Sequence, residues 1–179
     1  AGQKGFGLAF FSRYPILNAK NITPTDSSAS NGIAYADIKV FGEVMRVFNM
    51  HLQSYKFSIK QRRAFEVDGA ERPKPGSEWD NRSRWQFIKV MLKTWRDQEK
   101  QVRQFEATEQ HHDKNTVICA DLNNVPFSNY YRRIRGDLQD SFVQRGSGTG
   151  TTYPVRLLPL RIDYVFAVEN DTVVKHEVL

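Results

Sequence analysis

The sequence predicts a mixed α/β fold, built as a mostly antiparallel sandwich with helices on the outside. Apolar runs at residues 33–40 and 43–50, joined by Phe41 and Gly42, are typical of a β-hairpin. Between residues 83 and 109 the apolar side chains recur every three, four or seven positions, which indicates an amphipathic helix. Strands and helices mix without strict alternation, which argues against a doubly wound parallel sheet.

The other elements follow in order along the chain. Residues 6–11 form an apolar run that predicts a buried strand, ended by the turn residues at 12–15. Residues 55–82 are charged and contain two prolines and glycines, which indicates a charged insertion or a mobile loop. A strand is predicted at residues 115–120, and a short basic helix at residues 129–135.

The helix predicted between residues 83 and 109 is expected to cover a sheet from outside. Its Lys and Arg residues fall mostly on the face opposite the apolar one, so packing on a sheet is favoured over a partner-binding role. Its apolar positions are Trp85, Ile88, Met91, Leu92, Trp95, Val102 and Phe105.

Length and composition indicate one globular domain over residues 1–179. No apolar run approaches the roughly 18 residues that a membrane span needs. The formal net charge of +6 is compatible with a phosphate-bearing partner without requiring one. The single cysteine, Cys119, lies in an apolar run and is expected to be a small buried side chain. Localisation and oligomeric state stay open, and a targeting or membrane segment upstream of Ala1 is one of the possibilities left open.

Polar residues interrupt three apolar runs in a way that predicts one shared site. His51 follows the second strand of the hairpin, Asp121 and Asn123 follow the strand at 115–120, and Asp163 lies within a later apolar run. Such side chains are rarely buried unless they are paired or used. We therefore expect these four residues to converge at one end of the sandwich.

These residue types suit the cleavage of a phosphoester, whose transition state concentrates negative charge on oxygen. Asp121 offers a base or a metal ligand, and Asn123 two residues on presents an amide to the same side of an extended segment. His51 can donate a hydrogen bond to phosphate. Asp163 can orient a histidine, as buried acids do in catalytic triads.

Three motifs in this order resemble those of the endonuclease/exonuclease/phosphatase, or DNase I-like, superfamily. They are residues 49–54 (NMHLQS), 120–128 (ADLNNVPFS) and 161–164 (RIDY), and residues 5–16, 138–142 and 150–153 also fit. The resemblance implies a four-layer α/β sandwich and hydrolysis that depends on Mg²⁺ or Mn²⁺. By matching motif, Asp121 activates or positions water, His51 and Asn123 hold the phosphate, and Asp163 pairs with a second histidine.

The chain departs from the family pattern at both ends. The metal-binding Glu motif is expected before Gly5 and the closing Ser-Asp-His motif after Leu179, so the chain resembles a fragment incomplete at both ends. Asp121 then remains as a weak metal ligand, and reduced or absent activity is expected. The substrate stays open between nucleic acid, a phosphoinositide and a phospholipid headgroup. A non-catalytic phosphate- or nucleic-acid-binding module derived from the same fold is the alternative, and a generic basic nucleic-acid-binding domain is a weaker one.

Overall fold

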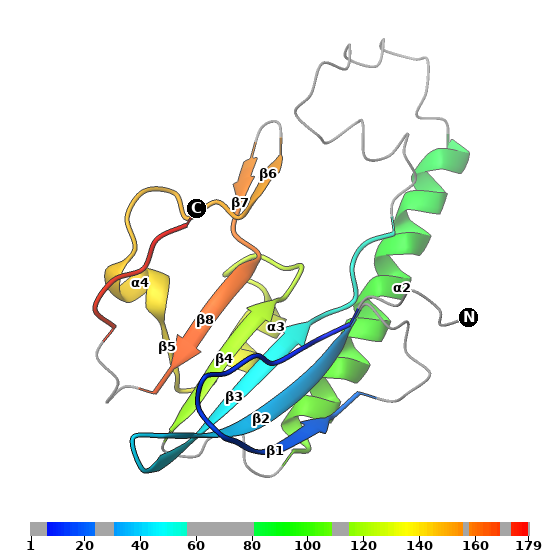
Figure 1. The fold of residues 1–179 in the computed structure, drawn as a ribbon. Coiled ribbons are helices and arrows are strands. Elements are labelled where there is room, and N and C mark those ends of the chain that lie inside the picture. The colour runs from blue at the N-terminus through cyan, green and yellow to red at the C-terminus, as the bar shows by residue number, and fades with distance from the viewer. Residues whose placement is uncertain are drawn as a thin grey trace, which may run out of the picture.

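The computed structural model describes residues 7–23, 31–56, 81–108, 115–155, 158–168 and 173–178. Within these ranges the predicted α/β class is confirmed (Figure 1). None of the helices there is both long and apolar enough to cross a membrane. The elements are β1 (Ile16–Asn21), β2 (Gly32–Val40), β3 (Glu43–His51), α2 (Asn81–Glu106), β4 (Thr116–Asp121), α3 (Asn129–Arg135), β5 (Gln139–Asp140), α4 (Ser141–Arg145), β6 (Tyr153–Val155), β7 (Leu158–Leu160) and β8 (Asp163–Ala167).

The described strands form a six-stranded sheet in the order β1-β2-β3-β4-β8-β5 and a two-stranded sheet of β6 and β7. All neighbours in the large sheet run antiparallel except β3 and β4, which are parallel, so the expected mixed and mostly antiparallel character is confirmed. The predicted hairpin is β2 and β3, and its turn residue Phe41 has a positive φ of 49° beside Gly42 at 95°. The parallel pair brings the carboxyl ends of β3 and β4 to the same edge of the sheet.

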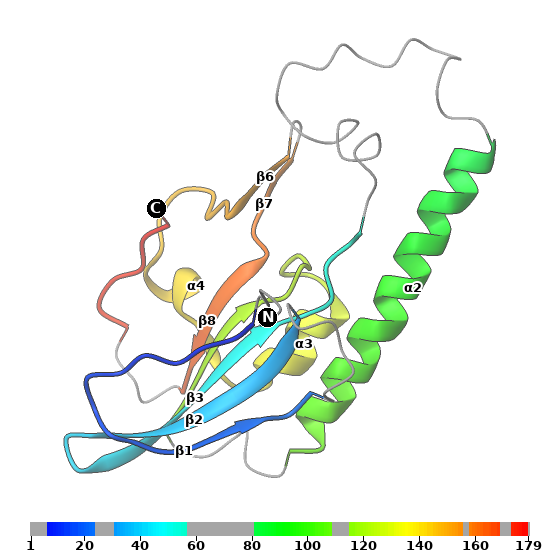
Figure 2. The same cartoon turned by 45° about the vertical axis from the view of Figure 1, so that its right-hand side comes forward.

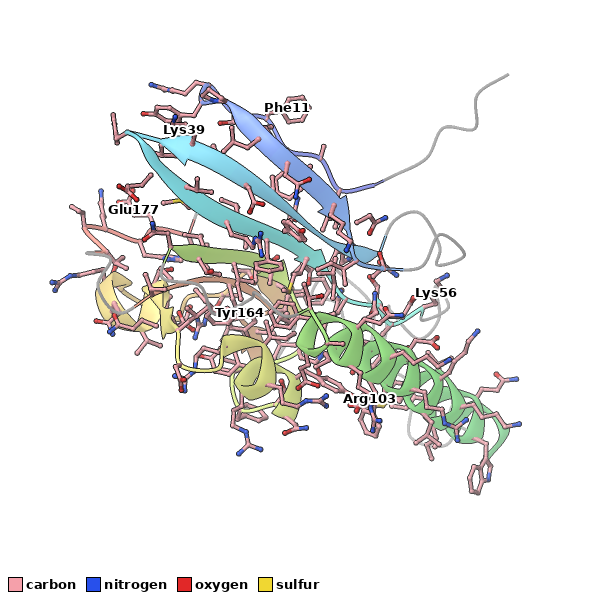
Figure 3. All side chains as sticks on the ribbon, turned by 90° about the horizontal axis from the view of Figure 1, so that it is seen from below. Phe11, Lys39, Lys56, Arg103, Tyr164 and Glu177 are labelled. Carbon is pink, nitrogen blue, oxygen red and sulfur yellow. The ribbon has the colours of Figure 1, made fainter. Side chains whose placement is uncertain are left out.

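The core lies between one face of this sheet and the helices α2 and α3. Strand residues on that face, such as Phe48 and Ile118, are fully buried against Val102 and Phe105 of α2 and Ile134 of α3. Alternate side chains of the same strands point to the opposite face. Figure 3 shows α2 and α3 on the same side of the sheet, with Arg103 of α2 and Phe11 on opposite sides of it.

Two expectations from the sequence differ from the structure. Residues 7–11 form no strand, and the side chain of Phe11 is 97% exposed. β1 pairs with β2 instead, and the segment at 7–11 lies against one face of the sheet, where Asn49 Nδ2 donates to the carbonyl of Ala9 at 3.3 Å. Cys119 is exposed because it alternates with the buried residues Ile118 and Ala120 and points away from the core. Most of the charged segment predicted at 55–82, namely residues 57–80, lies outside the described residues.

Candidate active site

The candidate site lies where β3 and β4 end and β8 begins. His51 is the last residue of β3 and faces Asp121, the last residue of β4, across the parallel pair. Asp121 in turn is the register partner of Asp163, the first residue of β8. Three strands that are distant in the sequence therefore bring an imidazole and two carboxylates together where β3 and β4 end and β8 begins. Figure 1 shows the arrowheads of β3 and β4 beside the start of β8.

Close polar contacts tie three of the four predicted residues into one cluster. His51 Nε2 lies 3.5 Å from Asp121 Oδ2. The backbone N–H of Asn123 donates to Asp121 Oδ1 at 2.9 Å, which closes a tight turn after β4. This turn holds Asn123 at a positive φ of 49°, a conformation that Asn tolerates better than most residues. The structure thus brings His51, Asp121 and Asn123 together through direct contacts, and Asp163 through strand pairing.

Ser54 is a fourth member of this cluster, and the sequence assigned it no role. Its hydroxyl lies 3.1 Å from His51 Nε2 and accepts a hydrogen bond from Asn123 Nδ2 at 3.3 Å. Asn123 Nδ2 also donates to the carbonyl of Leu52 at 3.1 Å. Ser54 therefore links the imidazole and the amide that were predicted to hold phosphate. Its place in the NMHLQS segment, three residues after His51, is the signal that could have identified it.

Two buried glutamines of α2 fix the segments that carry these residues. Gln98 Nε2 donates to the carbonyl of Gln53 at 2.8 Å, and Gln101 Oε1 accepts from the Gln53 N–H at 2.8 Å. Gln98 Oε1 also accepts from Asn124 Nδ2 at 3.1 Å. Buried amides need such partners, so α2 both covers the core and holds the two site segments in place.

The cluster opens into a pocket of about 460 Å³ on the face of the sheet away from α2. His51, Asp121 and Asp163 line it, together with Thr152 and His176. The hydroxyl of Thr152 accepts from the N–H of Asp163 at 3.2 Å, so it holds the start of β8. His176 Nδ1 lies 2.7 Å from Ser141 Oγ. Thr152 and His176 were not predicted, because nothing local in the sequence places them near β3 and β4.

Burial raises the pKa of the Asp121 carboxyl above its ordinary value. The nearby charge of Asp163 raises it further, while the Asn123 N–H and His51 oppose the shift. A carboxylate with a raised pKa is a stronger proton acceptor as long as it stays ionised. The arrangement therefore offers a base and a hydrogen-bond donor, Asp121 and His51, on the wall of one open pocket, with Asn123 in contact with Asp121 behind them.

A second hydrogen-bond network, centred on Asp140, holds the segment that leads into β8. The buried carboxylate of Asp140 accepts hydrogen bonds from Arg161 Nη1 at 2.8 and 2.9 Å and from the Tyr131 hydroxyl at 2.8 Å. It also caps α4 by accepting from the N–H groups of Phe142 and Val143. Burial and the hydrogen bond to Asp140 raise the pKa of Tyr131 to about 12. Arg161 precedes Asp163 by two residues, so this network anchors the entry into β8.

Comparison with known proteins identifies the family of the chain. The model of the endonuclease/exonuclease/phosphatase family matches residues 1–179, and the chain belongs to that family. No curated protein matches the chain.

Solved structures with similar folds come from several organisms. Sphingomyelinase C from Streptomyces griseocarneus is 20% identical (TM-score 0.45), and the match covers 88% of this chain and 51% of that one. The human nocturnin catalytic domain is 14% identical (TM-score 0.47), and the match covers 88% of this chain and 49% of that one. A Staphylococcus aureus beta toxin variant with bound magnesium ions is 16% identical (TM-score 0.42), and the match covers 90% of this chain and 52% of that one. The chain spans about half the length of these structures.

Proposed function

We propose that the protein is a divalent-metal-dependent hydrolase of phosphoester bonds. The observation that carries the proposal is the cluster at the strand ends, where the Asp121 carboxylate with its raised pKa lies beside His51 and Asn123 at an open pocket. Membership of the endonuclease/exonuclease/phosphatase family supports this class of chemistry. The substrate class is a phosphate ester of nucleic acid, of a phosphoinositide or of a phospholipid headgroup.

Each residue has a distinct part in the proposed reaction. Asp121 accepts a proton from the attacking water and orients it toward phosphorus, and the P–O bond to the leaving group breaks as solvent protonates the departing oxygen. As negative charge develops on the phosphoryl oxygens, His51 Nε2 donates to one of them, and the Asn123 amide exchanges its hydrogen bond to Ser54 for one to another. Asp163 faces Asp121 across the strand pair and raises its pKa, which strengthens it as a base.

The residues of the described ranges fit a divalent cation only in part. Asp121 and Asp163 are paired like charges at the pocket, and a cation beside Asp121 would relieve their repulsion. Within those ranges, however, no group of three or more His, Cys, Asp and Glu side chains could hold a metal ion. Mg²⁺ or Mn²⁺ bound at Asp121 would polarise a phosphoryl oxygen and lower the pKa of bound water. We expect this chain to bind Mg²⁺ weakly, with a Kd above the micromolar range in calorimetry.

The experiment that tests the proposal combines phosphate binding with turnover on the 179-residue chain. Inorganic phosphate is titrated by NMR, and hydrolysis of bis-p-nitrophenyl phosphate, an oligonucleotide, an inositol phosphate and sphingomyelin is assayed with Mg²⁺ and with Mn²⁺. Any turnover that the chain supports is expected to fall on the order of 10²-fold or more in kcat, with little change in KM, in each of His51→Ala, Asp121→Ala and Asn123→Ala. The exposed acid Asp137 gives the matched control Asp137→Ala, which should leave both readings unchanged.

The possible outcomes separate the alternatives. Phosphate binding at His51 and Asn123 without any turnover would favour the non-catalytic binding module. Turnover that survives Asp121→Ala would show that the site is assigned wrongly, although membership of the family would stand. A folded protein that neither binds phosphate nor hydrolyses any substrate of the panel would contradict both.

A further inference from the structure

The amino-terminal half of α2 leaves an apolar stripe uncovered. The sequence predicts that all seven apolar positions of this helix face a sheet, but the structure buries only Val102 and Phe105. Trp85 is 64% exposed, Ile88 and Leu92 are each 43% exposed, and Trp95 is 42% exposed. One continuous stripe of exposed apolar side chains is unusual on a soluble surface and marks a site of interaction.

The position of α2 explains why the stripe is uncovered. Its carboxyl-terminal half packs on the core through Gln98, Gln101, Val102 and Phe105, all of which are buried. Its amino-terminal half projects beyond the sheet, as Figures 1 and 2 both show. With about 100° of rotation per residue, Trp85, Ile88 and Leu92 fall within roughly 60° of one another. From Trp85 to Trp95 the stripe runs along the helix for about 15 Å.

Positive charge accompanies the stripe over the same stretch of helix. Residues 81–96 contain five basic residues and no acidic one, whereas residues 97–106 contain three acidic and two basic residues. The exposed side chains of Lys89, Lys93 and Arg96 fall within about 60° of one another, next to the apolar stripe. An apolar face flanked by cations, with tryptophan on it, is typical of a helix that lies in the headgroup region of a membrane.

We propose that the amino-terminal half of α2 docks on an anionic lipid surface. Trp85, Ile88 and Leu92 would enter the boundary between headgroups and acyl chains, and Lys89, Lys93 and Arg96 would contact lipid phosphates. Aliphatic side chains such as Ile88 and Leu92 gain little from nucleic acid, which is bound by stacking and hydrogen bonding. A second copy of this chain is a poor occupant, because a symmetric contact would oppose the same cations across the interface. The proposal is independent of the proposed catalytic function.

Vesicle sedimentation tests the proposal with the full chain. We expect binding to vesicles of 70% phosphatidylcholine and 30% phosphatidylglycerol, and at least tenfold weaker binding to phosphatidylcholine alone. The double variant Trp85→Ser/Leu92→Ser should lose about tenfold or more of the affinity for the anionic vesicles. Lys89→Gln/Lys93→Gln should weaken binding on the order of tenfold and reduce its dependence on salt.

Matched controls use exposed residues elsewhere on the protein. Val143→Ser/Val174→Ser removes two exposed apolar side chains, and Lys20→Gln/Lys39→Gln removes two exposed cations. Both should bind vesicles like the unmodified protein, and circular dichroism should show that all four variants are folded.

Three results would overturn the proposal. The first is failure of the unmodified protein to bind anionic vesicles, or equal loss of binding in the control variants. The second is a dimer in light scattering without lipid that Trp85→Ser/Leu92→Ser converts to a monomer. The third is binding to duplex DNA that both α2 variants weaken, while vesicle binding is unchanged.

Discussion

The hydroxyl of Ser54 is the smallest group on which the candidate site depends. It contacts both the imidazole of His51 and the amide of Asn123, which come from different segments of the chain. Removing it would leave the Asn123 amide held by the Leu52 carbonyl and the His51 ring beside Asp121, without the group that joins the two. Hydrogen-bond donors that are already oriented toward the developing negative charge contribute most to transition-state stabilisation. Loss of the Ser54 hydroxyl should therefore lower the reaction rate more than the stability of the fold.

Ser54→Ala is therefore expected to change the state of the site while the fold persists. The ¹⁵N chemical shifts of the His51 ring should move, because Nε2 loses its hydroxyl neighbour. Phosphate affinity should fall by roughly three- to tenfold, with unfolding changed by less than about 1 kcal/mol. The exposed Ser147 gives the control Ser147→Ala, and an unchanged His51 spectrum in Ser54→Ala would contradict the linking role.

The carboxyl pair offers a prediction about pH. Because burial and Asp163 raise the folded-state pKa of Asp121, its ionisation opposes folding, and the stability present at low pH is lost as pH rises through that pKa. Asp121→Asn should therefore raise the Tm at neutral pH. Asp163→Asn should lower the pKa of Asp121, which a ¹³C titration of the Asp121 carboxyl in metal-free buffer can follow. A Tm that falls in Asp121→Asn, or an unmoved titration in Asp163→Asn, would contradict this electrostatic description.

The sequence predicted the four site residues because each is a polar interruption at the end of, or inside, an apolar run. That pattern is local, so it can be read without coordinates. Thr152 and His176 could not be found in this way, since their neighbours carry no such contrast and only tertiary packing brings them to the pocket. Thr152 and His176 line the pocket only because β8 and the segment at 173–178 pack beside β3 and β4 in the folded chain.

At the scale of elements, the network around Asp140 joins α3, α4 and the entry to β8. Asp140 and Arg161 are both buried, with side-chain exposures of 1% and 9%. Asp140→Ala should lower the free energy of unfolding by about 3–5 kcal/mol, because the Arg161 charge would be left buried without its partner. Urea unfolding measures the loss. The double variant Asp140→Ala/Arg161→Met should recover part of it, and a loss below about 1 kcal/mol in the single variant would refute the structural role.

The elements also show where a sequence pattern reaches its limit. The hairpin of β2 and β3 was predicted because its alternation and its turn are both local signals. The apolar period of α2 correctly gave a helix, but its period could not show that the sheet ends before the helix does. At about 100° per residue, Leu92 lies roughly 80° and Trp85 roughly 100° from Val102 around the helix, so both are turned away from the core side and are exposed. The apolar run at 7–11 failed as a strand because it lies against one face of the sheet, where Asn49 Nδ2 donates to the carbonyl of Ala9 and Leu8 lines the pocket.

At the scale of the molecule, the mixed antiparallel character of the sheet was predictable and its strand order was not. Local patterns gave β2, β3, β4 and the apolar run of β8 but not β1, β5, β6 or β7. Nothing local showed that β8 pairs between β4 and β5, or that β3 and β4 run parallel. The parallel pair requires the chain to cross back over the sheet, and α2 lies in that connection. The position of α2 over the core and the alignment of His51 with Asp121 therefore have the same topological origin.

The placement of His51, Asp121 and Asp163 on three strands far apart in the chain has a consequence for folding kinetics. Contacts between distant segments form slowly, because loop-closure entropy is lost before the contacts stabilise the chain. During refolding from urea, helical circular dichroism should therefore return before phosphate binding does, and the phosphate-binding signal should follow the slowest phase. Stopped-flow measurement of both signals checks this order. If it holds, a nascent or partly unfolded chain can possess α2 and the β2–β3 hairpin while having no site at all.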